Sequence, residues 1–123
     1  MKTYSSIFLL IIISIISCNS PKPEFSLAPV FSNKMVLQQA QSNAVWGTSA
    51  PFSKIILTSS WGEQVITHTN DLGSWNLQLP TPAYKKSMNT EKLSFKVSDG
   101  SSTIEINDIL IGEVWLASGQ SNM

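Results

Sequence analysis

The sequence predicts a mainly β chain, in which a β-sandwich is followed by the first strand and reactive turn of an incomplete α/β domain. From Ala28 onward, short runs of alternating apolar and polar residues replace the spacing of three and four that an amphipathic helix needs. Turn signals recur roughly every 8 to 12 residues, as in jelly-roll or immunoglobulin-like sandwiches of some seven or eight strands. The last apolar run breaks this alternation, which indicates a second domain.

One predicted hairpin joins the β-rich runs Gln64–Thr69 and Trp75–Leu79. The residues between them, Asn70–Gly73, are a turn signal, because Gly73 can take the positive φ that a tight reversal needs. We expect these two runs to pair with each other.

The remaining strands follow the same logic. Leu93–Ser98 alternates between apolar and polar residues, Asp99–Gly100 turns the chain, and Thr103–Ile106 continues as the second arm of a hairpin. Val45–Thr48 and Lys54–Ser59 are two further predicted strands. No helix is needed to account for the middle of the chain.

Composition and charge exclude several classes of protein. The chain has 123 residues, 8 basic against 8 acidic side chains and a hydrophobic fraction of 42%. Binding a nucleic-acid backbone requires a clustered basic surface, whereas the only adjacent basic pair here is Lys85–Lys86. We therefore expect no nucleic-acid partner. The low charge and high apolar content also exclude a disordered chain.

The amino-terminal apolar block has the pattern of an export signal. Ile7–Ile13 and Ile15–Ile16 follow Lys2 and stop at Ser17–Cys18. A membrane-spanning helix needs roughly 20 apolar residues, and this block is much shorter. We therefore expect export rather than a membrane-spanning anchor.

The lone cysteine stands where a bacterial lipoprotein signal ends. Ile15–Cys18 resembles a permissive lipobox, in which apolar residues and a small residue precede the cysteine. This pattern predicts a lipid on the Cys18 thiol and a lipoprotein of the cell envelope, in the periplasm, at the outer membrane or on the cell surface. The alternative is an ordinary signal peptide that is cleaved near Ser17 or Ser20.

These signals divide the chain into four parts. We expect a signal peptide over residues 1–17, a short extended tether over 18–26, the β-sandwich over 27–108, and the start of a second, truncated domain over 109–123. On this division the sandwich should fold without the last apolar run.

The last segment carries the candidate chemistry. Ile109–Ala117 is nearly continuous in apolar character, which suits a strand buried on both faces. It runs into the small polar residues Ser118–Met123, and open α/β sheets place reactive groups at the carboxyl ends of such strands. Ser121 is therefore a candidate nucleophile, against the alternative of an ordinary turn or helix-capping serine.

Several segments resemble a known family. Gly112–Leu116 followed by Ser118–Met123 resembles the first motif block of the sialate O-acetylesterase family. Pro29–Gln39, Ala44–Gly47 and Asp71–Trp75 are similar to the amino-terminal β-domain of that family. The resemblance covers nearly the whole mature chain.

The resemblance implies a serine esterase of the SGNH hydrolase type. Its substrates would be O-acetylated sialic acids or related acetylated glycans, and it would need no cofactor. Ser121 matches the family nucleophile, and Gly119, Gln120 and Asn122 form the nucleophile turn around it. Backbone N–H groups at Ser121 and Gly119 could stabilise an oxyanion there.

The family's His and Asp partners are expected far downstream of the serine. Within this chain the only histidine is His68, in an alternating run, where a solvent-facing role is the simpler interpretation. Asp71 and Asp99 belong to turns, and Glu113 is expected to hydrogen-bond locally. One His and one Cys cannot form a metal site. We expect a fragment that is inactive by itself.

The four tryptophans leave a second class of function open. Trp46, Trp75 and Trp115 lie in expected strands and are predicted to be in the core. Trp61 lies in a turn, where it could be an exposed contact or a lid over one end of the sandwich. The alternative hypothesis is a non-catalytic β-sandwich lipoprotein that binds glycans or proteins.

Overall fold

The structure is a computed structural model that describes residues 21–117. Eight strands and a single 3₁₀ helix make up its regular structure, so the prediction of a mainly β chain with seven or eight strands is confirmed for the described residues. The elements are β1 (Ser26–Leu27), β2 (Val36–Gln38), β3 (Ser42–Thr48), β4 (Lys54–Ser59), β5 (Gln64–His68), β6 (Ser74–Pro80), η1 (Lys86–Thr90), β7 (Leu93–Ser98) and β8 (Thr103–Gly112).

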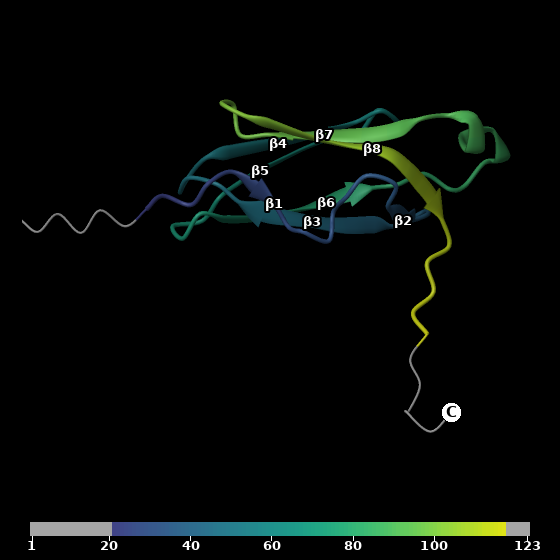
Figure 1. Cartoon of the computed structure of the whole chain (residues 1–123), viewed down its shortest axis with the longest axis horizontal. Coiled ribbons are helices and arrows are strands. Elements are labelled where there is room, and N and C mark those ends of the chain that lie inside the picture. The colour runs from purple at the N-terminus through teal and green to yellow at the C-terminus, as the bar shows by residue number, and fades with distance from the viewer. Residues whose placement is uncertain (1–20, 118–123) are drawn as a thin grey trace, which may run out of the picture.

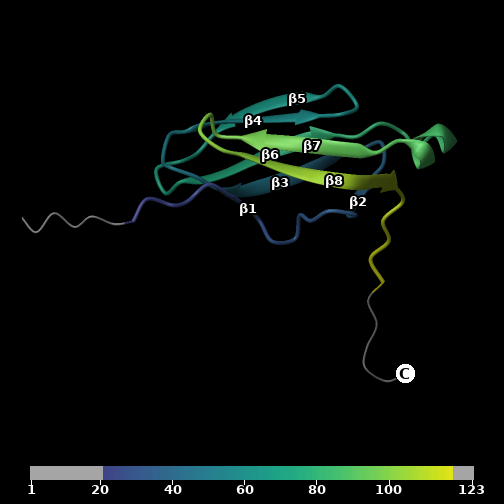
Figure 2. The same cartoon turned by 45° about the horizontal axis from the view of Figure 1, so that its top comes forward.

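The strands form two sheets that face each other. One has three strands in the order β1-β3-β6, and the other has five in the order β2-β8-β7-β4-β5. Figure 1 shows the two layers, with β4, β7 and β8 in one and β1, β3 and β6 in the other, and Figure 2 shows β5, β4, β7 and β8 following one another across the larger sheet. Neighbouring strands are antiparallel except for β2 and β8, which are parallel.

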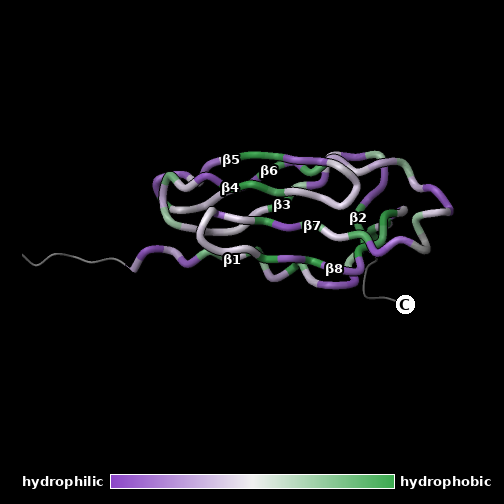
Figure 3. The backbone as a smooth tube through the Cα atoms, turned by 90° about the horizontal axis from the view of Figure 1, so that it is seen from above, coloured by the Kyte–Doolittle hydropathy of each residue, from purple (hydrophilic) through white to green (hydrophobic). Residues whose placement is uncertain are grey.

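The core lies between the layers and follows from the alternation in the sequence. Successive residues of a strand point to opposite faces, so every second residue enters the core. Figure 3 shows hydrophobic and hydrophilic stretches succeeding one another along β8. The buried hydrophobic side chains are Leu37, Val45, Ile55, Leu57, Trp75, Leu77, Leu79, Leu93, Phe95, Val97, Ile106, Ile109 and Ile111.

The predicted hairpin between Gln64–Thr69 and Trp75–Leu79 is wrong, because β5 pairs with β4 and β6 pairs with β3. The turn itself forms as expected. Asn70 Oδ1 accepts hydrogen bonds from the backbone N–H groups of Leu72 (3.0 Å) and Ser74 (2.9 Å), and Gly73 has a φ of +80°. Local turn chemistry reverses the chain, but here it carries the chain across the core to the other sheet.

The second predicted hairpin is confirmed, since β7 pairs with β8 in antiparallel register. Asp99 closes its turn. The carboxylate Oδ1 accepts the backbone N–H groups of Ser101 (3.0 Å) and Ser102 (2.8 Å). A side chain that satisfies two backbone donors explains why this short reversal can leave Ser98 paired with Thr103 directly beside the turn.

A bulge in β8 shifts its alternation by one residue. The register moves from Phe95 opposite Ile106 to Leu93 opposite Ile109, so β8 carries one extra residue, and Asp108 has a φ of +58°. Without this bulge, strict alternation after Ile106 would turn Asp108 toward the core and Ile109 toward solvent. The bulge therefore keeps Ile106 and Ile109 both buried.

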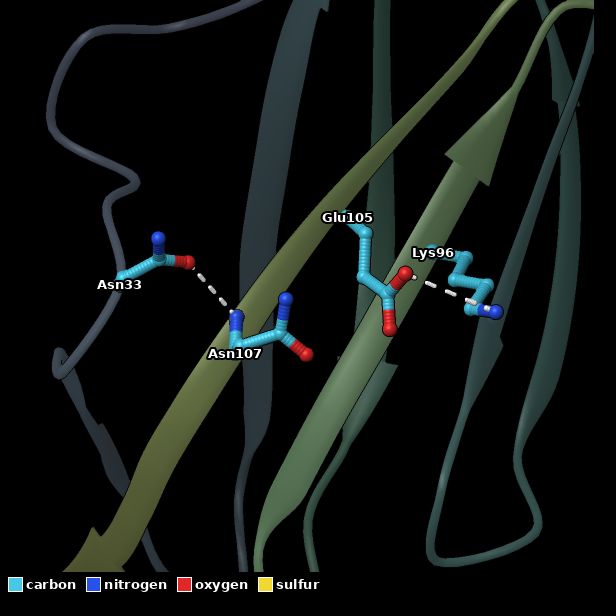
Figure 4. Close-up of polar contacts among 4 residues, drawn as sticks. All are labelled: Asn33, Lys96, Glu105 and Asn107. Carbon is cyan, nitrogen blue, oxygen red and sulfur yellow. Dashed lines mark hydrogen bonds and ion pairs between the residues drawn. The ribbon is translucent and has the colours of Figure 1, made fainter.

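A side chain outside the sheet braces the bulge. Asn33 Oδ1 accepts the backbone N–H of Asn107 at 2.8 Å (Figure 4). The same view shows Lys96 Nζ 3.6 Å from Glu105 Oε2, across the β7–β8 pair, and both side chains are largely exposed. An exposed pair of this kind adds little stability, so the amide contact is the more specific restraint on the local backbone.

The predicted boundary between residues 108 and 109 falls inside β8. Ile109 and Ile111 are 1% and 4% exposed, respectively, and belong to the core. Leu110 pairs with Val36, and Gly112 pairs with Gln38, so β2 has no other strand partner than this part of β8 in the described chain. The β-domain therefore extends to Gly112.

Two of the four tryptophans are more exposed than the sequence predicts. Trp75 is 3% exposed and lies in the core as predicted, but the predictions for Trp46 (44% exposed) and Trp115 (84%) are wrong. Trp61 is the lid rather than the free contact, because its Nε1 donates to the Pro80 carbonyl at 2.9 Å and its ring packs against the core. Trp46 faces outward because the inward positions of β3 belong to Val45 and Gly47.

Gly47 lets β1 and Trp75 approach β3 closely. A Cβ atom built on Gly47 would lie 2.0 Å from the Ser26 carbonyl oxygen and 2.8 Å from Trp75 Cζ2. Gly47→Ala is therefore expected to lower the free energy of unfolding by about 2–3 kcal/mol, because β1 must move away. Urea unfolding followed by tryptophan fluorescence measures the change. Gly112→Ala is the matched control, since a Cβ there meets nothing within 4 Å. Equal losses in both variants would contradict the steric account.

Candidate functional site

The predicted nucleophile turn lies outside the described residues. This holds for Ser121 and for its neighbours Gly119, Gln120 and Asn122, and the predicted lipidation site Cys18 also lies outside them. The structure does describe the approach to this turn, Glu113–Ala117, which leaves the end of β8 (Figure 1). Within the described residues, the candidate site therefore consists of the side chains that orient Glu113–Ala117.

The segment Glu113–Ala117, which leads to the nucleophile turn, is more exposed than the sequence predicts. The expectation of a buried strand over Ile109–Ala117 is wrong beyond Gly112, where β8 ends. Val114, Trp115 and Leu116 are 53%, 84% and 95% exposed. They have the composition of a buried strand but lack neighbouring strands within the described part of the chain. Consecutive apolar side chains of this kind usually mark a surface that is covered by another segment or molecule.

Two glutamines hold the start of this approach. Gln38 Nε2 donates to Glu113 Oε2 at 3.1 Å, and Gln39 Nε2 donates to Glu113 Oε1. Both glutamines stand at the end of β2, about 75 positions earlier in the chain. The expectation that Glu113 hydrogen-bonds locally is therefore wrong. Sequence reasoning did not find this role for either glutamine, although both lie inside a segment that resembles the family.

The other end of each glutamine amide binds the backbone. Gln38 Oε1 accepts the N–H of Val114 at 2.6 Å, and Gln39 Oε1 accepts the N–H of Tyr84 at 2.6 Å. We call Gln38, Gln39 and Glu113 the Gln–Glu clasp. It ties together the end of β2, the exit from β8 and the segment between β6 and η1. The direction in which the chain leaves the β-domain is thereby fixed at its first two residues.

A second layer of hydrogen bonds supports the clasp from below. The backbone carbonyl of Gln38 accepts Thr81 Oγ1 at 2.6 Å and Asn43 Nδ2 at 3.0 Å. Asn43 Nδ2 also donates to Thr81 Oγ1 at 3.0 Å, and Thr81 is buried. These contacts anchor the backbone of Gln38 to β3 and to the end of β6, so the exposed clasp rests on a buried support.

The clasp also favours the charged form of its carboxylate. Hydrogen bonds from the side chains of Gln38 and Gln39 lower the pKa of Glu113 from its ordinary value. At neutral pH Glu113 is therefore an acceptor for both amides. Because the group is fully exposed, this arrangement serves geometry more than stability.

His68 does not come near the clasp. It is exposed on β5 opposite Lys54, at the end of the larger sheet where the β7–β8 turn lies. The exit at Gly112 is at the other end of β8, roughly 30 Å away at about 3.3 Å per strand residue. The expectation of a solvent-facing histidine is confirmed, and the position offers no base for chemistry near the exit.

The carboxylates of the turns serve those turns. Burial alone would raise the pKa of Asp99, but hydrogen bonds from Ser102, Ser101 and Ser49 outweigh it and lower the pKa to about 2. Asp71 lies in the turn after β5. Over residues 21–117, no three His, Cys, Asp or Glu side chains are placed to hold a metal ion.

No helix among the described residues has the length and apolar character needed to span a membrane. The described part of the chain is built almost entirely of strands and the turns between them. The predicted signal peptide, residues 1–17, lies outside it.

The segments that resemble the family meet in space as pairs. The clasp joins Pro29–Gln39 to Gly112–Leu116. Ala44–Gly47 meets Asp71–Trp75, where Gly47 leaves room for the ring of Trp75 and Ser49 N donates to the carbonyl of Gly73 at 2.8 Å. These motifs therefore shape the β-domain and its exit.

Comparisons with known proteins show which proteins the chain is similar to. No family model matches the chain. It is 32% identical over 114 residues to the sialate O-acetylesterase of Homo sapiens and 30% identical over 104 residues to that of Mus musculus, which covers 80% of this chain in both cases. The structure resembles that of a carbohydrate acetylesterase from Xanthomonas citri, with a TM-score of 0.67, 30% identity and 80% of this chain covered.

The chain spans only about a fifth of each of these relatives, 20% and 19% of the two mammalian esterases and 21% of the bacterial one. The likeness nevertheless includes both sequence and structure, and it extends over most of the chain. It agrees with the resemblance carried by the four motif segments that the structure brings together in pairs. This chain belongs to the sialate O-acetylesterase family.

Proposed function

We propose that this chain is the amino-terminal part of a carbohydrate O-acetylesterase in which Ser121 is the nucleophile. The observation that carries the proposal is the combined likeness to sialate O-acetylesterases and to a carbohydrate acetylesterase over 80% of the chain. The described β-domain would support and direct the segment that carries Ser121. Residues beyond Gly112 would begin the SGNH hydrolase domain.

The proposed reaction is acyl transfer to a serine. Ser121 Oγ attacks the carbonyl carbon of an acetyl ester while a histidine base takes its proton. The backbone N–H groups of Ser121 and Gly119 would stabilise the oxyanion, and the sugar hydroxyl leaves with a proton. Water then cleaves the acetyl–serine ester and releases acetate. Gln120 and Asn122 would shape the turn that presents the hydroxyl.

The Gln–Glu clasp supports this proposal because it orients the chain shortly before Ser121. Glu113 is the eighth residue before Ser121, and the clasp orients the chain at Glu113 and Val114. A hydroxyl that must meet its base within hydrogen-bond distance benefits from a fixed approach. The clasp would therefore act on the reaction only through the position of the nucleophile segment.

The substrate class is an acetylated glycan, with O-acetylated sialic acid as one member. The test is acetate release by a form of the protein that extends through the downstream domain. It should be assayed on O-acetylated sialic acid and on a neutral acetylated oligosaccharide, each with its Ser121→Ala variant. Release from either substrate that depends on Ser121 supports the proposal, and release from neither contradicts it.

We further propose that the β-domain is an immunoglobulin-like sandwich. Its two sheets, β1-β3-β6 and β2-β8-β7-β4-β5, match an A-B-E sheet packed on an A′-G-F-C-C′ sheet. The crossing from β5 to β6 corresponds to the passage from one sheet to the other in that scheme. The parallel pairing of β2 with β8 also supports this assignment over a jelly roll, whose sheets are antiparallel.

Export and lipidation of the chain are part of the same proposal. The apolar block that stops at Cys18, the single cysteine, supports an envelope lipoprotein. In the described chain, Pro21–Phe25 precedes β1 at one end of the molecule and Gly112 lies at the other end (Figure 1). A tether at residue 18 would therefore keep the exit of β8 away from the membrane.

Replacing the proposed lipidation site should release the protein. Cys18→Ser is expected to move most of the protein from the membrane pellet to the soluble fraction, because a lipid on Cys18 is the proposed anchor. Fractionation followed by immunoblotting measures the shift. Ser20→Ala is the control, since it leaves the cysteine in place. A Cys18→Ser protein that stays in the pellet would count against the lipid anchor.

A further inference from the structure

A broad hollow is lined by residues of the three-stranded sheet, β1, β3 and β6, and by residues at the end of β5. It has a volume of about 1040 Å³ and is open to solvent. The register of β3 and β6 builds part of its surface, because residues directly opposite each other share a face. Trp46 lies opposite Asn76, and Ala44 lies opposite Gln78, and all four side chains are exposed.

The lining of the hollow has a distinct chemistry. No Asp, Glu, Lys or Arg occurs among the described residues that line it, although the chain contains 16 such residues, 8 of each sign. Its polar groups are amides, hydroxyls and one imidazole, supplied by β3, β6, β1 and the end of β5. The polar lining residues are Ser26, Thr48, Thr67, His68, Asn70, Ser74, Asn76 and Gln78.

Trp46 gives the hollow an aromatic face. It is 44% exposed, although the surrounding positions on its sheet face are small or polar. The rings of Trp46 and Phe31 form a T-shaped contact, with ring centroids 4.8 Å apart and planes at 78°. This contact restrains the indole, which stays partly exposed to solvent. A restrained aromatic side chain can bind a ligand without losing much conformational entropy.

We propose that this hollow binds a neutral oligosaccharide chain, with Trp46 as the stacking surface. A sugar ring has an apolar C–H face and an equatorial rim of hydroxyls. The indole of Trp46 matches the face, and the amides of Asn76 and Gln78, which both donate and accept hydrogen bonds, match the rim. A lining without charged side chains favours an uncharged ligand over an anionic one.

One core side chain also borders the hollow. Trp75 lines the hollow, is 3% exposed, and its Nε1 makes no hydrogen bond to any other part of the described chain. Trp75 is held in place by its contact with Gly47, so the site is built on rigid strands.

This site is separate from the nucleophile segment. The hollow lies over β3, β6 and β1, whereas the approach to Ser121 leaves β8 beside the Gln–Glu clasp. The inference goes beyond the proposed function, on which it rests only for the choice of glycans as probes. The two can fail independently, because binding at Trp46 requires no ester cleavage and Ser121 requires no Trp46.

The test is a titration of the protein with uncharged oligosaccharides. Cellohexaose, xylohexaose and mannohexaose serve as neutral probes, and 3′-sialyllactose serves as the anionic comparison, with intrinsic tryptophan fluorescence and calorimetry as readouts. At least one neutral probe is expected to bind with a dissociation constant below about 1 mM, at least tenfold tighter than 3′-sialyllactose. Trp46→Ala should weaken that binding at least tenfold, and Asn76→Ala several-fold.

Matched variants distinguish binding in the hollow from binding elsewhere on the protein. Trp115→Ala removes a more exposed tryptophan outside the hollow and should leave binding unchanged. Circular dichroism checks that Trp46→Ala is folded. The proposal is overturned if no neutral probe binds below about 1 mM, if 3′-sialyllactose binds as well, or if Trp115→Ala weakens binding as much. A folded Trp46→Ala protein that binds normally would also overturn it.

Discussion

Ser121→Ala is expected to lower acetate release at least about 1000-fold in a form of the protein that extends through the downstream hydrolase domain. The reason is that a serine hydroxyl forms the acetyl intermediate, and alanine has no atom that can do so. The loss should appear in kcat, with little change in the dissociation constant for the glycan. Acetate release from an O-acetylated glycan is the measurement.

The 123-residue chain by itself is expected to release no acetate above background. Its only histidine, His68, lies at the opposite end of the sheet from the exit that leads to Ser121. A serine without a base within hydrogen-bond distance keeps its proton at neutral pH. His68→Ala in the extended form is the control and should retain full activity. Release by the 123-residue chain that Ser121→Ala abolishes would contradict this account.

The β-rich nature of the chain could be predicted because it depends on local patterns. Leu93, Phe95 and Val97 alternate with polar residues and are all buried, and the turn at Asp99 forms where Asp and Gly stand together. Alternation and turn chemistry act over a few residues, so the sequence carries them directly. The β7–β8 hairpin followed from these two signals alone.

The pairing of strands could not be predicted in the same way. The turn at Asn70–Gly73 forms as expected, yet it joins two different sheets. A turn sets the reversal of the chain, while the choice of neighbour depends on which apolar faces meet across the core. β5 pairs with β4 along Ile55 and Leu57, and β6 instead completes the sheet of β3.

The bulge in β8 and the Gln–Glu clasp are two further features that could not be predicted from the sequence. An extra residue at Asp108 reverses the alternation of β8, and nothing in the pattern before it predicts a shift. The clasp depends on contacts between Gln38, Gln39 and Glu113 across about 75 positions. In the sequence, the one feature that these three residues share is that they lie in segments that resemble the family.

The exit segment illustrates why composition can mislead. Trp115 stands in an apolar run that is typical of a core strand, but it lies beyond the end of β8 and is 84% exposed. Trp46 fits the alternation of β3, but its side chain points to solvent. Gly47 takes the inward position next to Trp75. Periodicity predicts which residues share a face, and only packing decides which face is buried.

Removing all residues after Asp108 is expected to unfold the β-domain, which reverses the expectation from sequence alone. The deletion removes Ile109 and Ile111, both in the core, and each buried isoleucine contributes about 2–5 kcal/mol by comparison with alanine substitutions. It also removes the strand that pairs with β2, leaving Leu37 without its neighbours. Losses of this size match the whole stability of a small domain, about 5–15 kcal/mol.

A deletion that starts at Glu113 is the matched control, because it keeps β8 and its pairing with β2 intact. This shorter deletion removes the exposed side chains of Val114, Trp115 and Leu116 and the exposed clasp contacts, so we expect a change in unfolding free energy below about 2 kcal/mol. Near-ultraviolet circular dichroism and urea titration compare the two forms. A cooperative unfolding transition in the chain that ends at Asp108 would show that the last part of β8 is dispensable, and the boundary of the β-domain would then return to residue 108.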